Sequence, residues 1–244
     1  MLALTASELL EAWGAGQDRP PIQRALMLLA AAYPDIPADM LGRLSIGQRD
    51  GLLLQLREKI FGTQLGGVVT CGGCGACLEL SFHIADVRVA PTIELKETHP
   101  LSVAGYEVRF RLPNSQDLMA LQADNDFIST CYRLLKRCIL TAQYDGKETA
   151  VDQLPTDILD TIAQQMSKVD SQAEVYLSVS CPACSRRWQV TFDIVTFFWS
   201  EINAWAHRTL REVHALASAY GWSEPAILTL SPWRRRAYLE LVQR

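Results

Sequence analysis

The sequence predicts an α+β fold: a β core made of two hairpins that lie far apart in the chain, with helices before, between and after them. Three observations lead to this expectation. Residues 1–62 and 196–244 carry apolar side chains at helical spacing. Residues 63–195 begin and end in β-branched or alternating segments bounded by Gly and Pro. A helical pattern returns inside this core at about 114–170, which predicts a helical insertion.

The N-terminal helical region contains three stretches that we expect to be helices. The first begins after Thr5, whose hydroxyl can cap a helix, and Glu8 completes the pattern of a capping box. The second, "PPIQRALMLLAAAY", opens with prolines that suit a helix entry. The third is "SIGQRDGLLLQLREKIFG", in which leucines recur at helical spacing and Gly62 marks the end.

Two short cysteine motifs are each expected to lie at the tip of a hairpin. Segments 66–70 and 77–89 have the character of strands on either side of the first motif. Segments 173–180 and 186–194 flank the second motif in the same way. A further strand is expected at 106–112, "YEVRFRL".

The insertion between the hairpins is expected to be helical. Asn114 follows a strand and suits the N-cap of the first helix. A later helix places Cys131 and Cys138 on one apolar face, so we expect both to be buried core thiols rather than metal ligands. The last helix of the insertion is expected to begin with Thr156 as its cap.

The C-terminal region is expected to start with a long amphipathic helix that Gly221 ends, followed by two short helices. The last of these, "SPWRRRAYLELVQR", places three arginines between two aromatic residues. One interpretation is a surface helix whose aromatic side chains pack on the core. The other is a partner-binding face, because Trp, Tyr and Arg dominate interface hot spots. The candidate partner-binding residues are Trp233, Arg234, Arg235, Arg236 and Tyr238.

Four cysteines form the strongest chemical pattern in the chain. "CGGC" supplies Cys71 and Cys74, and "CPAC" supplies Cys181 and Cys184. Two thiolates on one tight turn can face the same ion, and Gly or Pro helps the backbone to fold beneath it. Zinc prefers a tetrahedron of four ligands, thiolates among them. We therefore expect a zinc ribbon with one structural Zn²⁺, although an all-thiolate site also accepts iron.

Other thiols and imidazoles leave alternatives open. Cys77 repeats the two-residue spacing and could replace a ligand, but an inward-facing core thiol is favoured. His83 is expected to be a half-buried strand residue. His207 and His214 lie seven residues apart on the long helix, where an exposed face is favoured over a second metal site. The two C-x-x-C motifs could also be unrelated thiols or a redox pair, but a redox motif normally opens a helix.

No catalytic constellation accompanies the cysteines. Four thiolates close the zinc shell, whereas catalytic zinc keeps an open position. The sequence lacks the H-E-x-x-H motif, a nucleophile elbow, the H-x-E signature of zinc deaminases and a P-loop. Asp117, Asp157 and Asp160 are expected at helix caps or on solvated helix faces. We therefore expect a protein that is not an enzyme.

Composition limits the partners and the cellular compartment that we expect for the protein. The 244 residues carry a formal net charge of -4, which does not provide the basic footprint of a nucleic-acid-binding protein. No apolar stretch is long enough to span a membrane, and the N-terminus does not resemble a signal peptide. Seven cysteines, an odd number, favour a reducing compartment. We expect a cytoplasmic protein with no membrane partner.

Several phrases in a fixed order resemble one known family. They are "GQRDGLLLQLREKIFG", "CGGCGACLEL", "VRFRLPNSQDL", "CPACSRRWQVTFDIVTFFWSEI" and "REVHALASAYGWSEPAILTLSPWRRRAYLELV". The chain is similar to zinc-finger-bearing proteins encoded among baseplate genes of contractile phage tails and extracellular contractile injection systems. Some members are described as relatives of the baseplate hub assembly chaperone of T-even phages. The resemblance covers the chain from about residue 45 to its end.

The resemblance implies a non-enzymatic assembly factor or structural adaptor that binds hub or wedge proteins of a baseplate. It implies that the four cysteines of the two C-x-x-C motifs hold a metal, and that the protein resides in a bacterial cytoplasm or in an assembled tail-like particle. The runner-up is a zinc-ribbon nucleic-acid-binding protein, supported by "SRRW" at 185–188 and "RRR" at 234–236. A thiol redox or metal-dependent enzyme is a third hypothesis.

Overall fold

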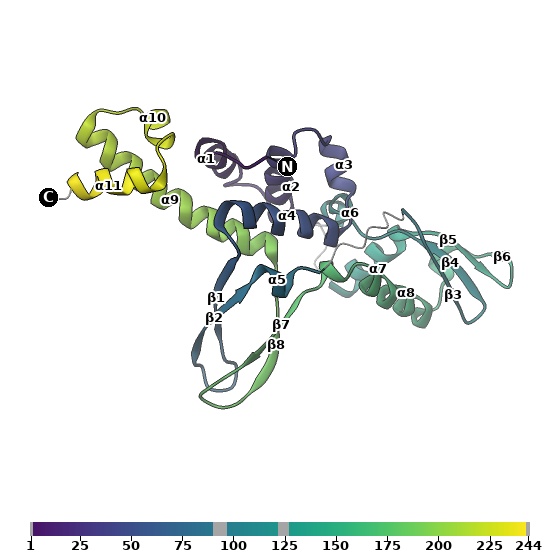
Figure 1. Ribbon diagram of the computed structural model, residues 1–244. Coiled ribbons are helices and arrows are strands. Elements are labelled where there is room, and N and C mark those ends of the chain that lie inside the picture. The colour runs from purple at the N-terminus through teal and green to yellow at the C-terminus, as the bar shows by residue number, and fades with distance from the viewer. Residues whose placement is uncertain (1, 90–96, 122–126, 243–244) are drawn as a thin grey trace. The chain divides into compact units, whose positions relative to one another are not determined.

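The computed structural model describes residues 2–89, 97–121 and 127–242, which are shown in Figure 1. The chain divides into two compact units. A terminal unit combines Met1–Asp35 with Ile194–Arg244, and a central unit contains Ile36–Asp193. The sequence patterns predict three regions, 1–62, 63–195 and 196–244, and this division stays a prediction.

The terminal unit is a group of helices packed on the long helix α9 (Ile194–Tyr220). Its other helices are α1 (Ala6–Ala15), α2 (Pro21–Ala32), α10 (Glu224–Leu228) and α11 (Pro232–Val242). Their packing buries a cluster of apolar side chains: Leu10, Ala206, Val213, Leu216, Ile227 and Leu228.

Two predicted helix ends in this unit are confirmed. At the start of α1 the Thr5 hydroxyl oxygen accepts the Glu8 backbone N–H at 3.3 Å, and the Glu8 carboxylate accepts the Thr5 backbone N–H at 2.8 Å. This is the reciprocal capping box that the sequence predicts. The long helix α9 ends at Tyr220, just before Gly221, whose φ of +67° is a left-handed angle that glycine adopts readily.

The central unit mixes helices with small antiparallel sheets, in agreement with the α+β class predicted. Its helices are α3 (Ala38–Arg43), α4 (Ile46–Phe61), α5 (Ile84–Val87), α6 (Ser115–Leu121), α7 (Phe127–Cys138) and α8 (Thr156–Val169), with 3₁₀ turns η1 (Val151–Gln153) and η2 (Ser171–Ala173).

Two hairpins flank the cysteine motifs, as the sequence predicts. Strand β1 (Gln64–Thr70) pairs with β2 (Cys77–His83), and β7 (Tyr176–Ser180) pairs with β8 (Arg187–Thr191). Figure 1 shows the two hairpins side by side, with their tips close together.

Three of these strands are shorter than predicted. The expected strand 173–180 begins only at Tyr176, after η2, and the expected strand 186–194 ends at Thr191, before α9. The expected strand 77–89 ends at His83, because the next four residues form α5 instead. The Asp86 carboxylate accepts the backbone N–H of His83 at 2.8 Å, which stabilises the start of a helical turn.

The insertion is not only helical, contrary to the prediction. Strands β3 (His99–Val103), β4 (Tyr106–Phe110), β5 (Ile139–Tyr144) and β6 (Lys147–Glu148) form a four-stranded sheet in that order. Strand β4 confirms the strand expected at 106–112, whereas β5 and β6 lie inside the segment 114–170 that the sequence predicts to be helical. The turn between β5 and β6 consists of Asp145 and Gly146, with φ angles of +46° and +77°. An Asp-Gly pair is a strong signal for a two-residue hairpin turn, and it is the signal that the helical interpretation overlooks.

One face of this sheet packs with α7 and α8 around an apolar core. Its buried members are Val108, Phe110, Leu135, Cys138, Ile139, Ala142, Leu154, Ile158, Leu159, Ile162 and Met166. The insertion therefore has a hydrophobic core of its own within the central unit.

Two side-chain predictions in this region are wrong. Cys138 is buried as expected, and burial raises the pKa of its thiol to about 12, but Cys131 is exposed. Thr156 is the first residue of α8 rather than its cap, because Pro155 occupies the N-cap position without a side-chain hydrogen bond.

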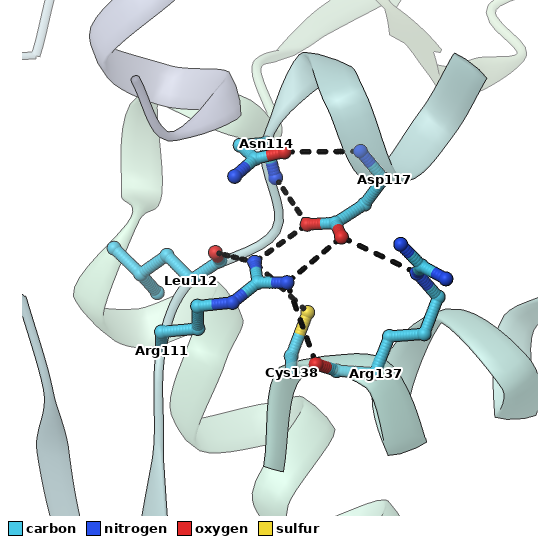
Figure 2. A network of polar contacts seen from close by, with 6 residues as sticks. All are labelled: Arg111, Leu112, Asn114, Asp117, Arg137 and Cys138. Atoms are coloured by element: carbon cyan, nitrogen blue, oxygen red, sulfur yellow. Dashed lines mark hydrogen bonds and ion pairs between the residues drawn. The ribbon is translucent and has the colours of Figure 1, made fainter. Parts of the chain in front are cut away.

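A polar network joins the segment after β4 to helices α6 and α7 (Figure 2). The Arg111 guanidinium donates to both carboxylate oxygens of Asp117, at 2.5 and 2.8 Å. Asn114 caps α6 as predicted, since its side-chain oxygen accepts the Asp117 backbone N–H at 3.0 Å. Arg137 of α7 adds a contact to Asp117 at 3.4 Å. The carboxylate of Asp117 thus links three segments of the insertion.

Asp117 is buried, although the sequence predicts a solvated position for it. Only 2% of the residue is exposed, whereas Asp157 and Asp160 are exposed as expected. Burial by itself raises the pKa of the carboxyl group, but the hydrogen bonds from Arg111 and Asn114 outweigh burial and hold the pKa below its ordinary value. Asp117 is therefore ionised at neutral pH and paired.

Replacing Asp117→Ala is expected to lower the free energy of unfolding by about 3 kcal/mol, because it leaves a partly buried guanidinium without its partner. Urea denaturation followed by circular dichroism measures this loss. The matched variant Asp157→Ala, at an exposed site on α8, should change stability by less than about 1 kcal/mol.

The same pair predicts a pH dependence. A carboxyl group with a lowered pKa in the folded state stabilises the fold above its unfolded pKa of about 4, and this contribution is lost as pH falls through the folded pKa. The stability gap between wild type and Asp117→Ala should therefore narrow in acid. An equal gap at pH 7 and at low pH would contradict the role assigned to this ion pair.

Candidate metal centre

Four thiols from the two hairpin tips form one cluster. The Sγ atoms of Cys71, Cys74, Cys181 and Cys184 all lie within 4.8 Å of one another. The distance from Cys71 Sγ to Cys184 Sγ is 3.6 Å, and that from Cys74 Sγ to Cys181 Sγ is also 3.6 Å. Both close pairs join the two hairpins, so the fold brings together the four residues that the sequence singles out.

The two tips have the same backbone turn. In the first, the Cys71 N–H donates to the Ala76 carbonyl at 2.8 Å, and the Gly75 N–H donates to the Cys71 carbonyl at 2.9 Å. The second tip repeats both bonds, from the N–H groups of Cys181 and Ser185, each at 2.8 Å. This repeated turn places two sulfurs per hairpin on the side that faces the other hairpin.

One position of the turn requires an unusual backbone angle. The residue after the second cysteine has φ of +74° at Gly75 and +58° at Ser185. Glycine adopts this left-handed conformation without cost, whereas a residue with a Cβ pays about 1–2 kcal/mol. The second tip therefore carries local strain that the first tip avoids.

The hairpins also contact each other away from the thiols. Half-buried or buried residues alternate with exposed ones on all four strands, so each hairpin has one apolar face. Phe82 at the end of β2 packs edge-to-face on Phe192 after β8, with ring centroids 5.7 Å apart. At the tip, a Cβ on Gly73 would lie only 3.1 Å from Arg186 Cδ. The close approach of the two tips leaves little room there for a larger residue than glycine.

Side chains next to η2 tie the bases of the hairpins together. The Gln172 amide donates to the Val87 carbonyl at 3.1 Å and accepts the Val89 N–H at 2.7 Å, which joins the segment before β7 to the segment after β2. The Asp170 carboxylate accepts the Ser45 hydroxyl at 3.0 Å, which joins the segment before η2 to the N-terminal end of α4. The hairpins are thus joined at their bases through Gln172, and the four thiols meet at their tips.

The spacing of the sulfurs fits a tetrahedral ion. Four thiolates at the usual zinc–sulfur distance of about 2.3 Å would lie about 3.8 Å from one another along the edges of a tetrahedron. The two 3.6 Å distances and the 4.8 Å limit bracket this value. A four-thiolate donor set suits zinc or iron and leaves no position open for substrate.

The pKa values of the clustered thiols also favour a bound cation. Backbone N–H groups of Gly73 and Cys74 point at Cys71 Sγ and lower the pKa of that thiol to about 6. At Cys184 the Arg186 N–H lowers the pKa too, but the neighbouring sulfurs of Cys71 and Cys74 outweigh it and raise the pKa to about 12. The first thiolate of the cluster therefore forms readily. Each further thiolate is less favourable, because it adds negative charge beside the first. A divalent cation at the centre would allow all four to ionise.

The other candidate ligands lie outside this cluster. Cys77 is exposed on β2, so the expectation of an inward-facing core thiol is wrong. His83 is exposed at the end of β2 rather than half-buried. His207 and His214 lie on the exposed face of α9, as favoured from the sequence. Among the described residues, the four-cysteine cluster is the one group of His, Cys, Asp and Glu side chains with metal-binding spacing.

The structure divides the C-terminal candidate residues into two groups. Arg235 is 5% exposed, and its guanidinium donates to the Glu212 carboxylate at 3.0 Å and to the Leu230 carbonyl at 2.8 Å. Tyr238 packs edge-to-face on Trp222 with ring centroids 4.9 Å apart. These two residues hold α11 against its own unit. The exposed members of the set are Trp233, Arg234 and Arg236.

Comparison with known proteins gives one match. A family described as "T4 bacteriophage base plate protein" matches residues 4–199, which includes all four clustered cysteines. Searches of the curated proteins and of the solved structures found no significant match. No helix in the described part of the chain is long and apolar enough to cross a membrane.

The strained position at the second tip generates a stability prediction. Ser185→Gly should raise the free energy of unfolding by about 0.5–1 kcal/mol, because relief of the left-handed strain exceeds the added entropy of the unfolded chain. Gly75→Ala should lower it by about 1 kcal/mol. Urea unfolding curves of the two variants measure both changes.

The matched control is Gly67→Ala, because Gly67 lies on β1 at an ordinary φ and an added Cβ there meets nothing within 4 Å. A substitution at this site should raise the free energy of unfolding by about 0.5 kcal/mol, because alanine lowers the entropy of the unfolded chain and meets no neighbour. Destabilisation by Ser185→Gly would contradict the equivalence of the two turns.

Proposed function

The chain belongs to the T4 bacteriophage base plate protein family, and on this basis we propose that it is a non-enzymatic, zinc-stabilised assembly factor or structural adaptor of a contractile-tail baseplate. The family match over residues 4–199 supports a baseplate role. The meeting of four thiols from two distant hairpins supports stabilisation by a metal, and it is the observation on which the proposal depends.

The proposed metal site has a structural role. One Zn²⁺ would be bound by Cys71, Cys74, Cys181 and Cys184, and the fold of both hairpin tips would depend on it. Each hairpin has only two strands, which are marginally stable alone in water. Binding free energy at such a site becomes folding free energy, so the ion would set the stability of the central unit.

The proposed action is protein–protein binding. A closed four-thiolate shell offers no open coordination position, which favours a structural role for the ion over a catalytic one. The partners would be hub or wedge proteins of the baseplate, met in the bacterial cytoplasm during assembly of the phage tail or of a related contractile injection system.

Metal analysis of cysteine variants tests the site. Cys71→Ser and Cys181→Ser should each reduce bound zinc from one ion per chain to almost none, and lower the thermal midpoint by about 10 °C or more. Cys77→Ser is the matched control, because Cys77 is exposed and outside the cluster. Loss of zinc from this control, or retention of zinc by the other two variants, would refute the ligand set.

Co-expression tests the function. The tagged full-length chain is produced together with hub and wedge proteins of a contractile-tail baseplate, purified by affinity chromatography and analysed by native mass spectrometry. The proposal predicts a stoichiometric complex with a hub or wedge protein. Recovery of the chain alone, from cells in which the other proteins are soluble, would count against it.

A further inference from the structure

Helix α11 has two apolar faces, and only one of them is used inside the protein. The inner face carries Tyr238 and Leu239, which pack in the core of the terminal unit. The outer face carries Trp233, Ala237 and Leu241 at intervals of four, so the three lie along one side of the helix. Trp233 is 77% exposed and Leu241 is 58% exposed. We name this outer stripe the Trp233–Leu241 stripe.

Two arginines beside this stripe, Arg234 and Arg236, do not stabilise the helix that carries them. Arg234 and Arg236 are exposed in the first turns of α11, at the end where the helix dipole is positive. Neither guanidinium forms an ion pair with another described residue. A cation in the first turn of a helix costs stability, so the position of Arg234 favours a negatively charged ligand over a role in folding.

The stripe is presented on a rigid support. Arg235 is fixed by the Glu212 carboxylate and the Leu230 carbonyl, and Tyr238 is fixed against the ring of Trp222. A helix that is anchored on its inner face loses little freedom when its outer face binds a partner. Trp flanked by Arg on such a support is the composition of an interface hot spot.

From these observations we propose that the Trp233–Leu241 stripe binds an acidic amphipathic helix of another baseplate protein. The stripe spans nine residues, about 12 Å along the axis, which matches two turns of a partner helix. Ala237 lies at its centre, where a small side chain permits close approach of the two helices. Acidic side chains of the partner face Arg234 and Arg236, and the exposed Glu240 favours a neutral or basic residue towards the other end.

A protein partner fits this surface better than a nucleic acid. A base could stack on Trp233, and phosphates could bind Arg234 and Arg236, but the aliphatic part of the stripe at Leu241 offers nothing to a polyanion. Glu240 beside it repels phosphate, and the net charge of the chain is -4. The inference rests on the proposed function, since it assigns a surface to the baseplate partner that function requires.

The test uses the complex that the full-length chain forms with its baseplate protein in co-expression. After purification of both components, titration calorimetry compares wild type with Trp233→Ala and with the double variant Arg234→Glu/Arg236→Glu. Trp233→Ala should weaken binding by about 30-fold or more, and Trp233→Phe should restore most of the affinity. The charge reversal should weaken binding by about 10-fold, with less effect at high salt.

Matched controls separate this surface from general effects. Arg208→Glu/Arg211→Glu makes the same charge change on the exposed face of α9 in the same unit and should leave the affinity within about twofold. Because Trp233 is exposed, its variants should keep the wild-type circular dichroism spectrum and thermal midpoint.

Each outcome has a distinct meaning. If wild type binds no baseplate protein, the proposed function fails and this inference fails with it. If wild type binds and the Trp233 and arginine variants bind equally well, the proposed function stands and the Trp233–Leu241 stripe is refuted. Tight binding of a single- or double-stranded oligonucleotide that Trp233→Ala abolishes, without loss of the protein complex, would reassign the surface to nucleic acid.

Discussion

The central unit depends on one constraint: two hairpins more than a hundred residues apart must meet at their tips. The close contacts Cys71–Cys184 and Cys74–Cys181 span sequence separations of 113 and 107 residues. Closing a chain segment of this length costs entropy, and two-stranded hairpins contribute little stability of their own. Four thiols that hold one ion would offset that cost at the hairpin tips.

The rest of the central unit is arranged so that this meeting can occur. Gln172 joins the segments at the hairpin bases, and Asp170 joins the segment before β7 to the start of α4. The segment between the hairpins folds on its own hydrophobic core and is braced by Arg111 and Asp117. The insertion therefore returns the chain to the second hairpin without needing the metal for its own packing.

What the sequence predicts well is local, and what it predicts poorly depends on distant contacts. The cysteine turns, the Thr5 capping box and the glycine that ends α9 follow from a few neighbouring residues. The burial of Asp117 could not be predicted, because its partners Arg111 and Arg137 come from a strand end and another helix. Cys131 and Cys138 share a helix face, but only the end near Cys138 is covered by the sheet. The missed strands β5 and β6 are different, since their Asp-Gly turn was visible in the sequence.

X-ray absorption at the zinc edge of the purified wild-type protein tests the central claim most directly. The account predicts one zinc per chain with four sulfur neighbours at about 2.3 Å and no nitrogen or oxygen in the first shell. A first shell that contains nitrogen or oxygen would mean that the four clustered cysteines are not the complete ligand set. A protein without any bound metal would contradict the account, and the meeting of the hairpin tips would then need another cause.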